Sequence, residues 1–134
     1  MSSSVSVPTS GRTALVVDDD AFTCSCLTEL LADLGFSRVE TASNGRQALK
    51  LLRQFAATPD VLICDIYMPD MDGIEFLEQL IERRYTGRLM LVSGMDVQTL
   101  TLAREIADAG PMKFLGAFLK PLSRETLVQA LGSI

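Results

Sequence analysis

The sequence predicts an α/β domain in which helices cover both faces of a parallel β-sheet. Two observations lead to this fold class. Short apolar runs, such as residues 61–64, alternate with longer stretches whose apolar residues recur at helical spacing. Several of these runs stop at acidic or small polar residues, as expected where a buried strand reaches the edge of a sheet. With 134 residues, the chain suits one such domain and is too short for two.

The elements follow from the apolar pattern and its breakers. Strands are expected over residues 14–17, 38–42, 61–64, 89–92 and 117–119. Helices are expected from apolar residues spaced over 27–34, 48–55, 74–81, 97–109 and 127–131. Gly35 and Gly110 supply helix stops, and Ser123 caps the last helix. This strict alternation implies right-handed βαβ units, and hence a flavodoxin-like, doubly wound sandwich with five parallel strands in the order 2-1-3-4-5.

Small and polar residues crowd the N-terminal end of the chain. We therefore expect residues 1–11 to form a flexible tail and residues 12–134 to form the domain. The chain stops directly after the last expected helix, so we expect no effector domain within it. Whether the domain works alone or as a piece of a longer protein is left open.

Composition excludes several classes of function. The net charge of −5 argues against direct nucleic-acid binding. The sequence lacks both a secretory signal and a run of about 20 apolar residues that could span a membrane, so a cytoplasmic protein is expected. The absence of histidine excludes Ser-His and Cys-His catalysis and every His-based metal site. Cys24, Cys26 and Cys64 are expected to be ordinary reduced thiols.

Polar residues stand where four of the expected strands end. The first strand runs into Asp18-Asp19-Asp20, the third into Asp65, the fourth into Ser93 and the fifth into Lys120. In a sheet of order 2-1-3-4-5, strands 1 and 3 flank the point where strand order reverses, and ligands bind beyond the carboxyl ends of the strands there. The sequence therefore predicts one polar cluster at this edge of the sheet.

Carboxylates gathered in this way need compensating positive charge. Two carboxylates about 4 Å apart repel by roughly 4 kcal/mol at an effective dielectric constant near 20. Mg²⁺ prefers oxygen ligands and needs few carboxylates, and Lys120 adds an ammonium group. A metal, a hydroxyl at Ser93 and an ammonium are suited to stabilising a transferring phosphoryl group. Asp65, alone at the end of the most buried strand, suits the nucleophile, and Asp18 and Asp19 suit the metal ligands.

Four segments resemble the receiver domain of two-component response regulators. They are Leu15-Val16-Val17-Asp18-Asp19, Asp65-Ile66-Tyr67-Met68-Pro69-Asp70-Met71-Asp72-Gly73, Val92-Ser93-Gly94 and Lys120-Pro121. They occur in the family's order, and the likeness covers roughly residues 12 to 132. Together the four segments are a specific signature.

The resemblance assigns a role to each of these residues. It implies that Asp65 is the phosphoacceptor, that Asp18, Asp19, Asp65 and the backbone carbonyl of Tyr67 bind Mg²⁺, and that Ser93 and Lys120 bond the phosphoryl group. The phosphodonor would be a histidine kinase or a phosphotransfer protein. The domain would assist its own phosphorylation and dephosphorylation without being an enzyme, and its change of conformation would control an output domain or partner.

Shorter sequence features suggest a partner, an output domain and local roles for several residues. A homodimer would form through the face of the fourth helix, fifth strand and last helix. The segment 113–116 and Gly94, which follows Ser93, are similar to receivers joined to EAL-type cyclic-di-GMP phosphodiesterase domains. Tyr67 is bulky and would hinder attacking water, so slow hydrolysis of the phosphoaspartate is expected. Asp20 is expected to be a helix cap or a solvated charge, and Asn44 a helix cap. Asp70 and Asp72 are expected to shape a turn and start a helix.

Two departures from the family pattern concern the readout. Ala117 stands three positions before Lys120, where the family carries an aromatic switch residue, and Phe118 would point to the opposite face of the strand. In addition, 27 positions separate Ser93 from Lys120, several more than in most receivers. We expect the added residues around 109–114, beside the fourth helix.

Two other functions are compatible with parts of the pattern. A receiver-like interaction module that is never phosphorylated would fit the missing aromatic residue, although the complete acidic set argues against it. A phosphohydrolase of the haloacid-dehalogenase type would also use an aspartate, Mg²⁺, a hydroxyl and a lysine. Its Asp-x-Asp-x-Thr/Val signature fails at Asp18, where Phe22 takes the last position, and at Asp65, where Tyr67 replaces the second acid.

Overall fold

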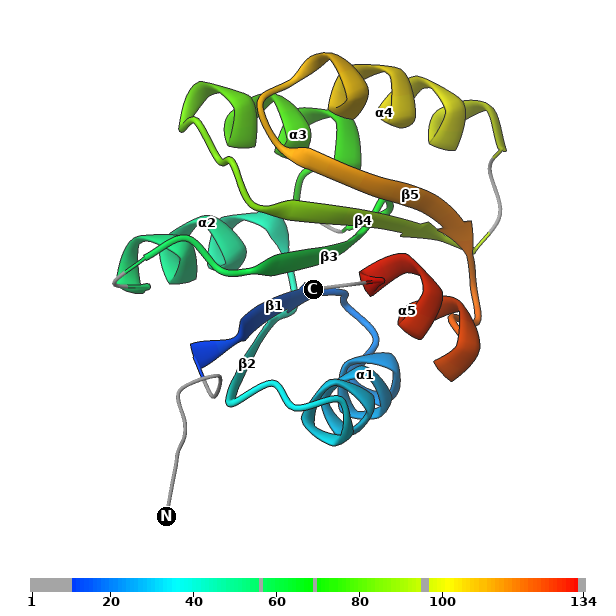
Figure 1. Ribbon diagram of the computed structural model, residues 1–134. Helices are drawn as coiled ribbons and strands as arrows, with labels where there is room; N and C mark the ends of the chain where they lie inside the picture. Colours follow the sequence, from blue (N-terminus) through cyan, green and yellow to red (C-terminus); the bar gives the residue numbers. More distant parts are fainter. Residues whose placement is uncertain (1–10, 56, 69, 95–96, 133–134) are drawn as a thin grey trace.

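Five parallel strands form one sheet with helices on both sides (Figure 1). The computed structural model describes residues 11–55, 57–68, 70–94 and 97–132. The strands are β1 (Thr13–Val17), β2 (Arg38–Ala42), β3 (Val61–Asp65), β4 (Arg88–Ser93) and β5 (Lys113–Leu119). The helices are α1 (Ala21–Asp33), α2 (Gly45–Gln54), α3 (Gly73–Glu82), α4 (Val97–Ala109) and α5 (Arg124–Leu131). Apart from Gly11, the predicted tail of residues 1–11 lies outside the described residues.

The strand order is β2-β1-β3-β4-β5, which confirms the predicted topology. All neighbouring strands are parallel, with Val17 paired to Cys64 and Asp65 to Val92. The carboxyl ends of β1, β3 and β4 therefore lie side by side. The residues that follow them must meet at one edge of the sheet.

Two hydrophobic clusters form the core, one on each face of the sheet. The first packs α2, α3 and α4 against side chains such as Leu62 and Cys64 of β3. The second packs α1 and α5 against the alternate β3 residues, Val61 and Ile63. All five residues of β3 are buried, which explains why this strand reads as a continuous apolar run instead of an alternation. Among the described residues, no helix is long and apolar enough to cross a bilayer.

Side chains cap the helices at the positions that the sequence suggested. The Asp20 carboxylate accepts from Phe22 N at the start of α1, and the Asn44 side chain accepts from Gln47 N at the start of α2. Asp72 caps α3 and Ser123 caps α5 in the same way. Each cap satisfies a backbone amide that has no partner inside its helix.

The fifth strand differs from the prediction, because it begins at Lys113 and not at Ala117. Leu89 pairs with Phe114 but Met90 pairs with Gly116, so Leu115 is an extra residue in a β-bulge. Gly116 has φ of 145°, and a β-carbon there would lie 2.7 Å from the Phe118 ring. The early start of β5 was not predicted, because pairing with β4 stabilises backbone that has no alternating side-chain pattern of its own. The placement of the added residues around 109–114 stays a prediction.

Candidate functional site

Two buried carboxylates lie together at the carboxyl edge of the sheet. Asp18 follows β1 and Asp65 ends β3, and their exposed fractions are only 4% and 5%. Asp19, beside Asp18, is exposed to solvent. The parallel pairing of β1 with β3 brings these residues together although 46 positions separate Asp19 from Asp65 in the sequence.

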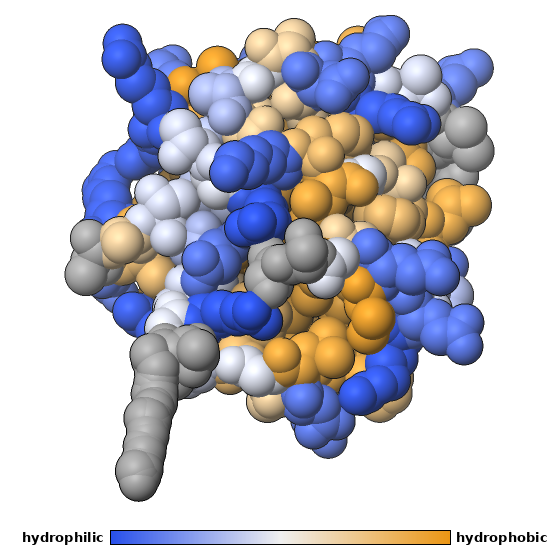
Figure 2. All heavy atoms as spheres, in the orientation of Figure 1, coloured by the Kyte–Doolittle hydropathy of each residue, from blue (hydrophilic) through white to orange (hydrophobic). Residues whose placement is uncertain are grey.

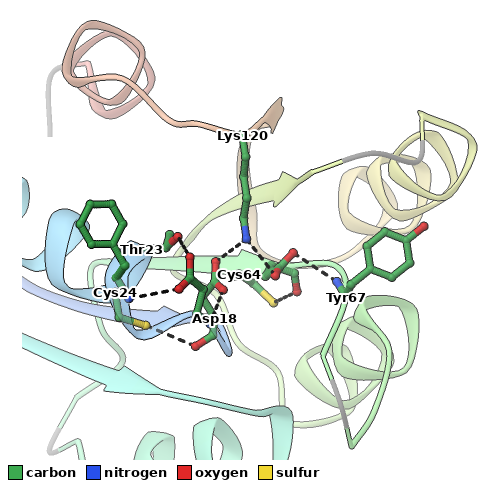
Figure 3. Close-up of polar contacts among 9 residues, drawn as sticks. Asp18, Thr23, Cys24, Cys64, Tyr67 and Lys120 are labelled. Atoms are coloured by element: carbon green, nitrogen blue, oxygen red, sulfur yellow. Dashed lines mark hydrogen bonds and ion pairs between the residues drawn. The ribbon is translucent and has the colours of Figure 1, made fainter.

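Lys120 joins the two buried carboxylates. Its Nζ lies 2.7 Å from Asp18 Oδ2 and 3.1 Å from Asp65 Oδ2. Figure 3 shows the side chain extending from the end of β5 toward Asp18. Since Lys120 directly follows β5, the far edge of the sheet supplies the positive charge for the acids of β1 and β3. The sequence predicted that Asp18, Asp65 and Lys120 would lie in one cluster, but it did not predict that Lys120 contacts both carboxylates.

The surroundings of the site change the pKa values of Asp65 and Lys120 for different reasons. Burial raises the pKa of Asp65, and the nearby charge of Asp18 raises it further, against the lowering effects of the Lys120 and Tyr67 hydrogen bonds. Burial alone lowers the pKa of Lys120, but its bonds to Asp18 and Asp65 outweigh burial, so the pKa is raised. The ammonium form of Lys120 is therefore favoured, and additional positive charge at Asp65 would favour its carboxylate form.

The carboxylates form a suitable donor set for a hard divalent cation. Asp18, Asp19 and Asp65 each offer one oxygen, and these oxygens all lie within 4.8 Å of one another. Because two of the acids are buried and the third is exposed, a cation held between them would keep contact with solvent. Oxygen donors, few in number and open to water on one side, fit the coordination that Mg²⁺ prefers.

Ser93 and Tyr67 lie beside this cluster. Ser93 ends β4 and is completely buried, and its carbonyl accepts from Lys120 N at 2.9 Å. The Tyr67 amide donates to Asp65 Oδ1 at 3.2 Å, which places the Tyr67 backbone against the acid. Tyr67 as a whole residue is 45% exposed, and its ring points away from Lys120 in Figure 3.

Two thiols contact the backbone of the acidic residues. Cys24 Sγ donates to the Asp18 carbonyl at 3.3 Å, and Cys64 Sγ donates to the Asp65 carbonyl at 3.1 Å. Burial is the main cause that raises the pKa of both thiols, so both stay protonated and able to donate. All three cysteines are free, in agreement with the prediction of reduced thiols. Their contacts with the acids were not predicted.

Asp70 makes a contact that the sequence did not suggest. Besides interacting with the local backbone at Asp70 and Met71, its carboxylate accepts from Gly45 N at 3.0 Å and Arg46 N at 2.9 Å, at the start of α2. It thereby connects the loop after Asp65 to α2. The partners lie about 25 positions away in the sequence, so no local pattern could have revealed this contact.

We expect Asp70→Ala to destabilise the domain by about 1 kcal/mol, because α2 would lose two hydrogen bonds and a favourable charge at its N-terminus. Urea unfolding would measure the change. Asp108→Ala is the matched control, since Asp108 is exposed on α4. Equal stability of the two variants would contradict a capping role for Asp70.

The position of the family's aromatic switch lacks a ring. Ala117 packs in the cluster with α2, α3 and α4, and Phe118 packs in the cluster on the opposite face. The predicted orientation of the two side chains is thus confirmed. A coupled movement of Ser93 with an aromatic residue at position 117 is not available to this chain.

Comparisons with known proteins agree with this geometry. The response regulator receiver domain family matches residues 14–132. The chemotaxis protein CheY of Bacillus subtilis is 31% identical over 117 residues, which are 87% of this chain and 92% of that protein. CheY of Thermotoga maritima is 28% identical over 92% of this chain and 98% of its own length.

A solved structure shows the same architecture. A chain of the CheX-CheY-BeF3-Mg+2 complex from Borrelia burgdorferi superposes with a TM-score of 0.77 at 27% identity, covering 90% of this chain and 86% of that one. The topology, the four segments at the strand ends and the family match lead to one conclusion. This chain belongs to the response regulator receiver domain family.

Proposed function

We propose that this receiver accepts a phosphoryl group on Asp65 from the phosphohistidine of a histidine kinase or a phosphotransfer protein. The observation that carries the proposal is the position of Asp65, whose buried carboxylate lies 3.1 Å from the Lys120 ammonium and beside two further acids. An oxygen nucleophile with positive charge at hand is what acyl-phosphate formation needs. Signalling would follow from the new covalent group, without turnover of a separate substrate.

The transfer itself is a displacement at phosphorus. A carboxylate oxygen of Asp65 forms the new O–P bond while the P–N bond to the donor imidazole breaks, and the imidazole nitrogen leaves with the electron pair and takes up a proton. Lys120 would balance the negative charge of the phosphoryl oxygens, and the Ser93 hydroxyl would donate to one of them. Asp18, Asp19, Asp65 and the Tyr67 carbonyl would hold Mg²⁺, which supplies positive charge to the phosphoryl oxygens when bound.

The output of the domain would be a shift between two conformations that a partner or output domain distinguishes. Exposed apolar side chains on α4 and at the end of β5, namely Leu102 and Leu119, support the predicted homodimer through the face of α4, β5 and α5. The segment 113–116 makes an EAL-type phosphodiesterase domain a candidate output. We infer a cytoplasmic role for such a module.

Intact-mass measurement tests the proposal directly. After incubation with acetyl phosphate and Mg²⁺, we expect the chain to gain the mass of one phosphoryl group, and with EDTA in place of Mg²⁺ we expect no gain. A chain that stays unmodified with Mg²⁺ would instead support the interaction module. Continuous release of phosphate from phosphomonoesters would support the phosphohydrolase.

Tyr67 provides a prediction about the lifetime of the phosphorylated state. We expect Tyr67→Asn to hydrolyse its phosphoaspartate severalfold faster than the wild type, because a small amide gives water more room beside Asp65 and can orient it. The ring points away from Lys120 in Figure 3, so it can shield the acid only after turning over the site. Decay of the phosphorylated mass after removal of acetyl phosphate measures the rate. Unchanged decay would contradict shielding.

A further inference from the structure

A hollow lies at the edge of the sheet opposite to the carboxylates. The C-terminal ends of α2 and α3 lie at the left edge in Figure 1, next to the starts of β3 and β4. The hollow between them has a volume of about 350 Å³. Its apolar lining includes Leu52, Phe55, Pro59, Leu80 and Tyr85. We call it the arginine hollow, because Arg53, Arg83 and Arg84 also line it.

The three arginines are exposed and form no ion pair with another described residue. In the described part of the chain, ion pairs join Arg38 to Glu40, Arg124 to Asp33, and Lys120 to its two aspartates, but none involves Arg53, Arg83 or Arg84. This concentration is notable in a chain with 12 basic and 17 acidic residues. Strongly hydrophilic groups line the same left edge in Figure 2. Three like charges around one hollow repel one another unless an anion lies between them.

Helix stability accounts for only part of this arrangement. Arg53 lies in the last turn of α2 and Arg83 is the C-cap of α3, where positive charge is favoured by the helix dipole. Arg84 is different, because its φ of 59° is left-handed. Its amide donates to Ile81 O and the next amide donates to Leu80 O, a Schellman ending whose left-handed position favours glycine. An arginine at this position makes the helix end less stable, so helix stability does not explain it.

The lining indicates the chemistry of the ligand. Guanidinium groups bind carboxylates through paired hydrogen bonds. Leu52 is half-buried and Ala57 is exposed at the wall of the hollow, so they can contact one apolar side chain of a ligand. The volume is at the lower end of the range for small-molecule sites, about 300 to 1,000 Å³. A long polyanion such as a nucleic acid would be repelled by the net charge of −5. A short segment with a few carboxylates meets mainly the local positive charge.

We propose that the arginine hollow binds an acidic peptide segment of a partner protein, with one apolar side chain against Leu52 and Ala57 and carboxylates on the three arginines. This interaction is separate from phosphorylation of Asp65, since the two sites lie at opposite edges of the sheet. Failure of either proposal would leave the other intact.

The test is an NMR titration of the full chain with a synthetic peptide of sequence Glu-Asp-Phe-Glu-Asp-Gly. We expect the amide signals of Leu52, Phe55, Leu80 and Tyr85 to shift, and the affinity to fall about tenfold in Arg53→Glu. Arg104→Glu is the matched control, because Arg104 is exposed on α4 and its reversal gives the same net charge. This control should bind like the wild type.

Arg84→Gly separates binding from folding. We expect this variant to bind the peptide less tightly and yet to unfold at a higher temperature, since glycine is favoured at a left-handed position. If Arg84 took no part in binding, the variant would unfold at a higher temperature but would bind the peptide as tightly as the wild type.

The proposal would be overturned if the chain did not bind the peptide at millimolar concentration, or if Arg53→Glu and Arg104→Glu lost the same amount of peptide affinity. It would also be overturned if a peptide with serine in place of phenylalanine bound with the same affinity as the original peptide. The fourth contradicting result is tighter binding of a single-stranded RNA hexanucleotide than of the peptide in the same hollow. Equal affinity for the serine peptide would indicate that the hollow recognises charge alone, and tighter binding of the RNA would indicate that it recognises phosphate.

Discussion

Replacing Asp65 by asparagine should abolish phosphorylation by acetyl phosphate and Mg²⁺ completely. The amide keeps the size of the carboxyl group but lacks the negative oxygen that attacks phosphorus. Intact mass after incubation would show the added phosphoryl group on the wild type and on Asp108→Asn, a control that changes an exposed aspartate of α4. Equal labelling of Asp65→Asn would show that another residue is the acceptor.

The loss can be separated from misfolding. Burial and the charge of Asp18 raise the pKa of Asp65, so its ionised form is less favourable in the folded state than in the unfolded chain. A neutral amide removes this cost at neutral pH. In EDTA we therefore expect Asp65→Asn to be at least as stable to urea as the wild type. A large loss of stability would indicate that the bond from Lys120 to Asp65 outweighs the cost of burial.

Removing Lys120 should destabilise the domain in a way that depends on the metal. Lys120→Met leaves Asp18 and Asp65, both almost fully buried, without the ammonium group that bonds them. Loss of one partner of a buried ion pair costs about 3–5 kcal/mol, but the Lys120 side chain is 25% exposed, so we expect about 2 kcal/mol in EDTA. Urea unfolding would measure this value.

In Mg²⁺ the stability difference between Lys120→Met and the wild type should shrink, because the cation compensates the same carboxylates. Phosphorylation should stay slow, since the phosphoryl oxygens lose a positive partner. Lys113→Met is the matched control: Lys113 is exposed at the start of β5, and its replacement should change neither quantity. The same loss of stability with and without Mg²⁺ would indicate that Lys120 acts by packing alone.

Local patterns were sufficient for most of the fold. The continuous apolar run of β3 and the alternation of strands with helices predicted the layers and the strand order, because a strand buried on both faces needs apolar residues throughout. The start of β5 could not be predicted in this way. Its first residues acquire their hydrogen bonds from β4 across a bulge, and nothing in the sequence of 113–116 specifies that partner.

In the candidate site too, some residues could be predicted from the sequence and others could not. Asp18, Asp65 and Lys120 were predicted, because parallel strands place their carboxyl ends at one edge. The bond from Asp70 to the start of α2 and the thiol contacts of Cys24 and Cys64 were not. Each depends on how a loop or helix lies against a neighbour, and residue spacing does not encode that position.

The sequence by itself determined the sheet, its order and the acids and lysine that meet at its carboxyl edge, since these follow from periodicity and from the end of each strand. Only the tertiary structure decided that Lys120 bonds both Asp18 and Asp65, and that Arg53, Arg83 and Arg84 surround one hollow at the opposite edge. The contacts of Lys120 and the grouping of the three arginines have the same physical reason. Such contacts depend on distances between separate elements, and packing alone sets those distances.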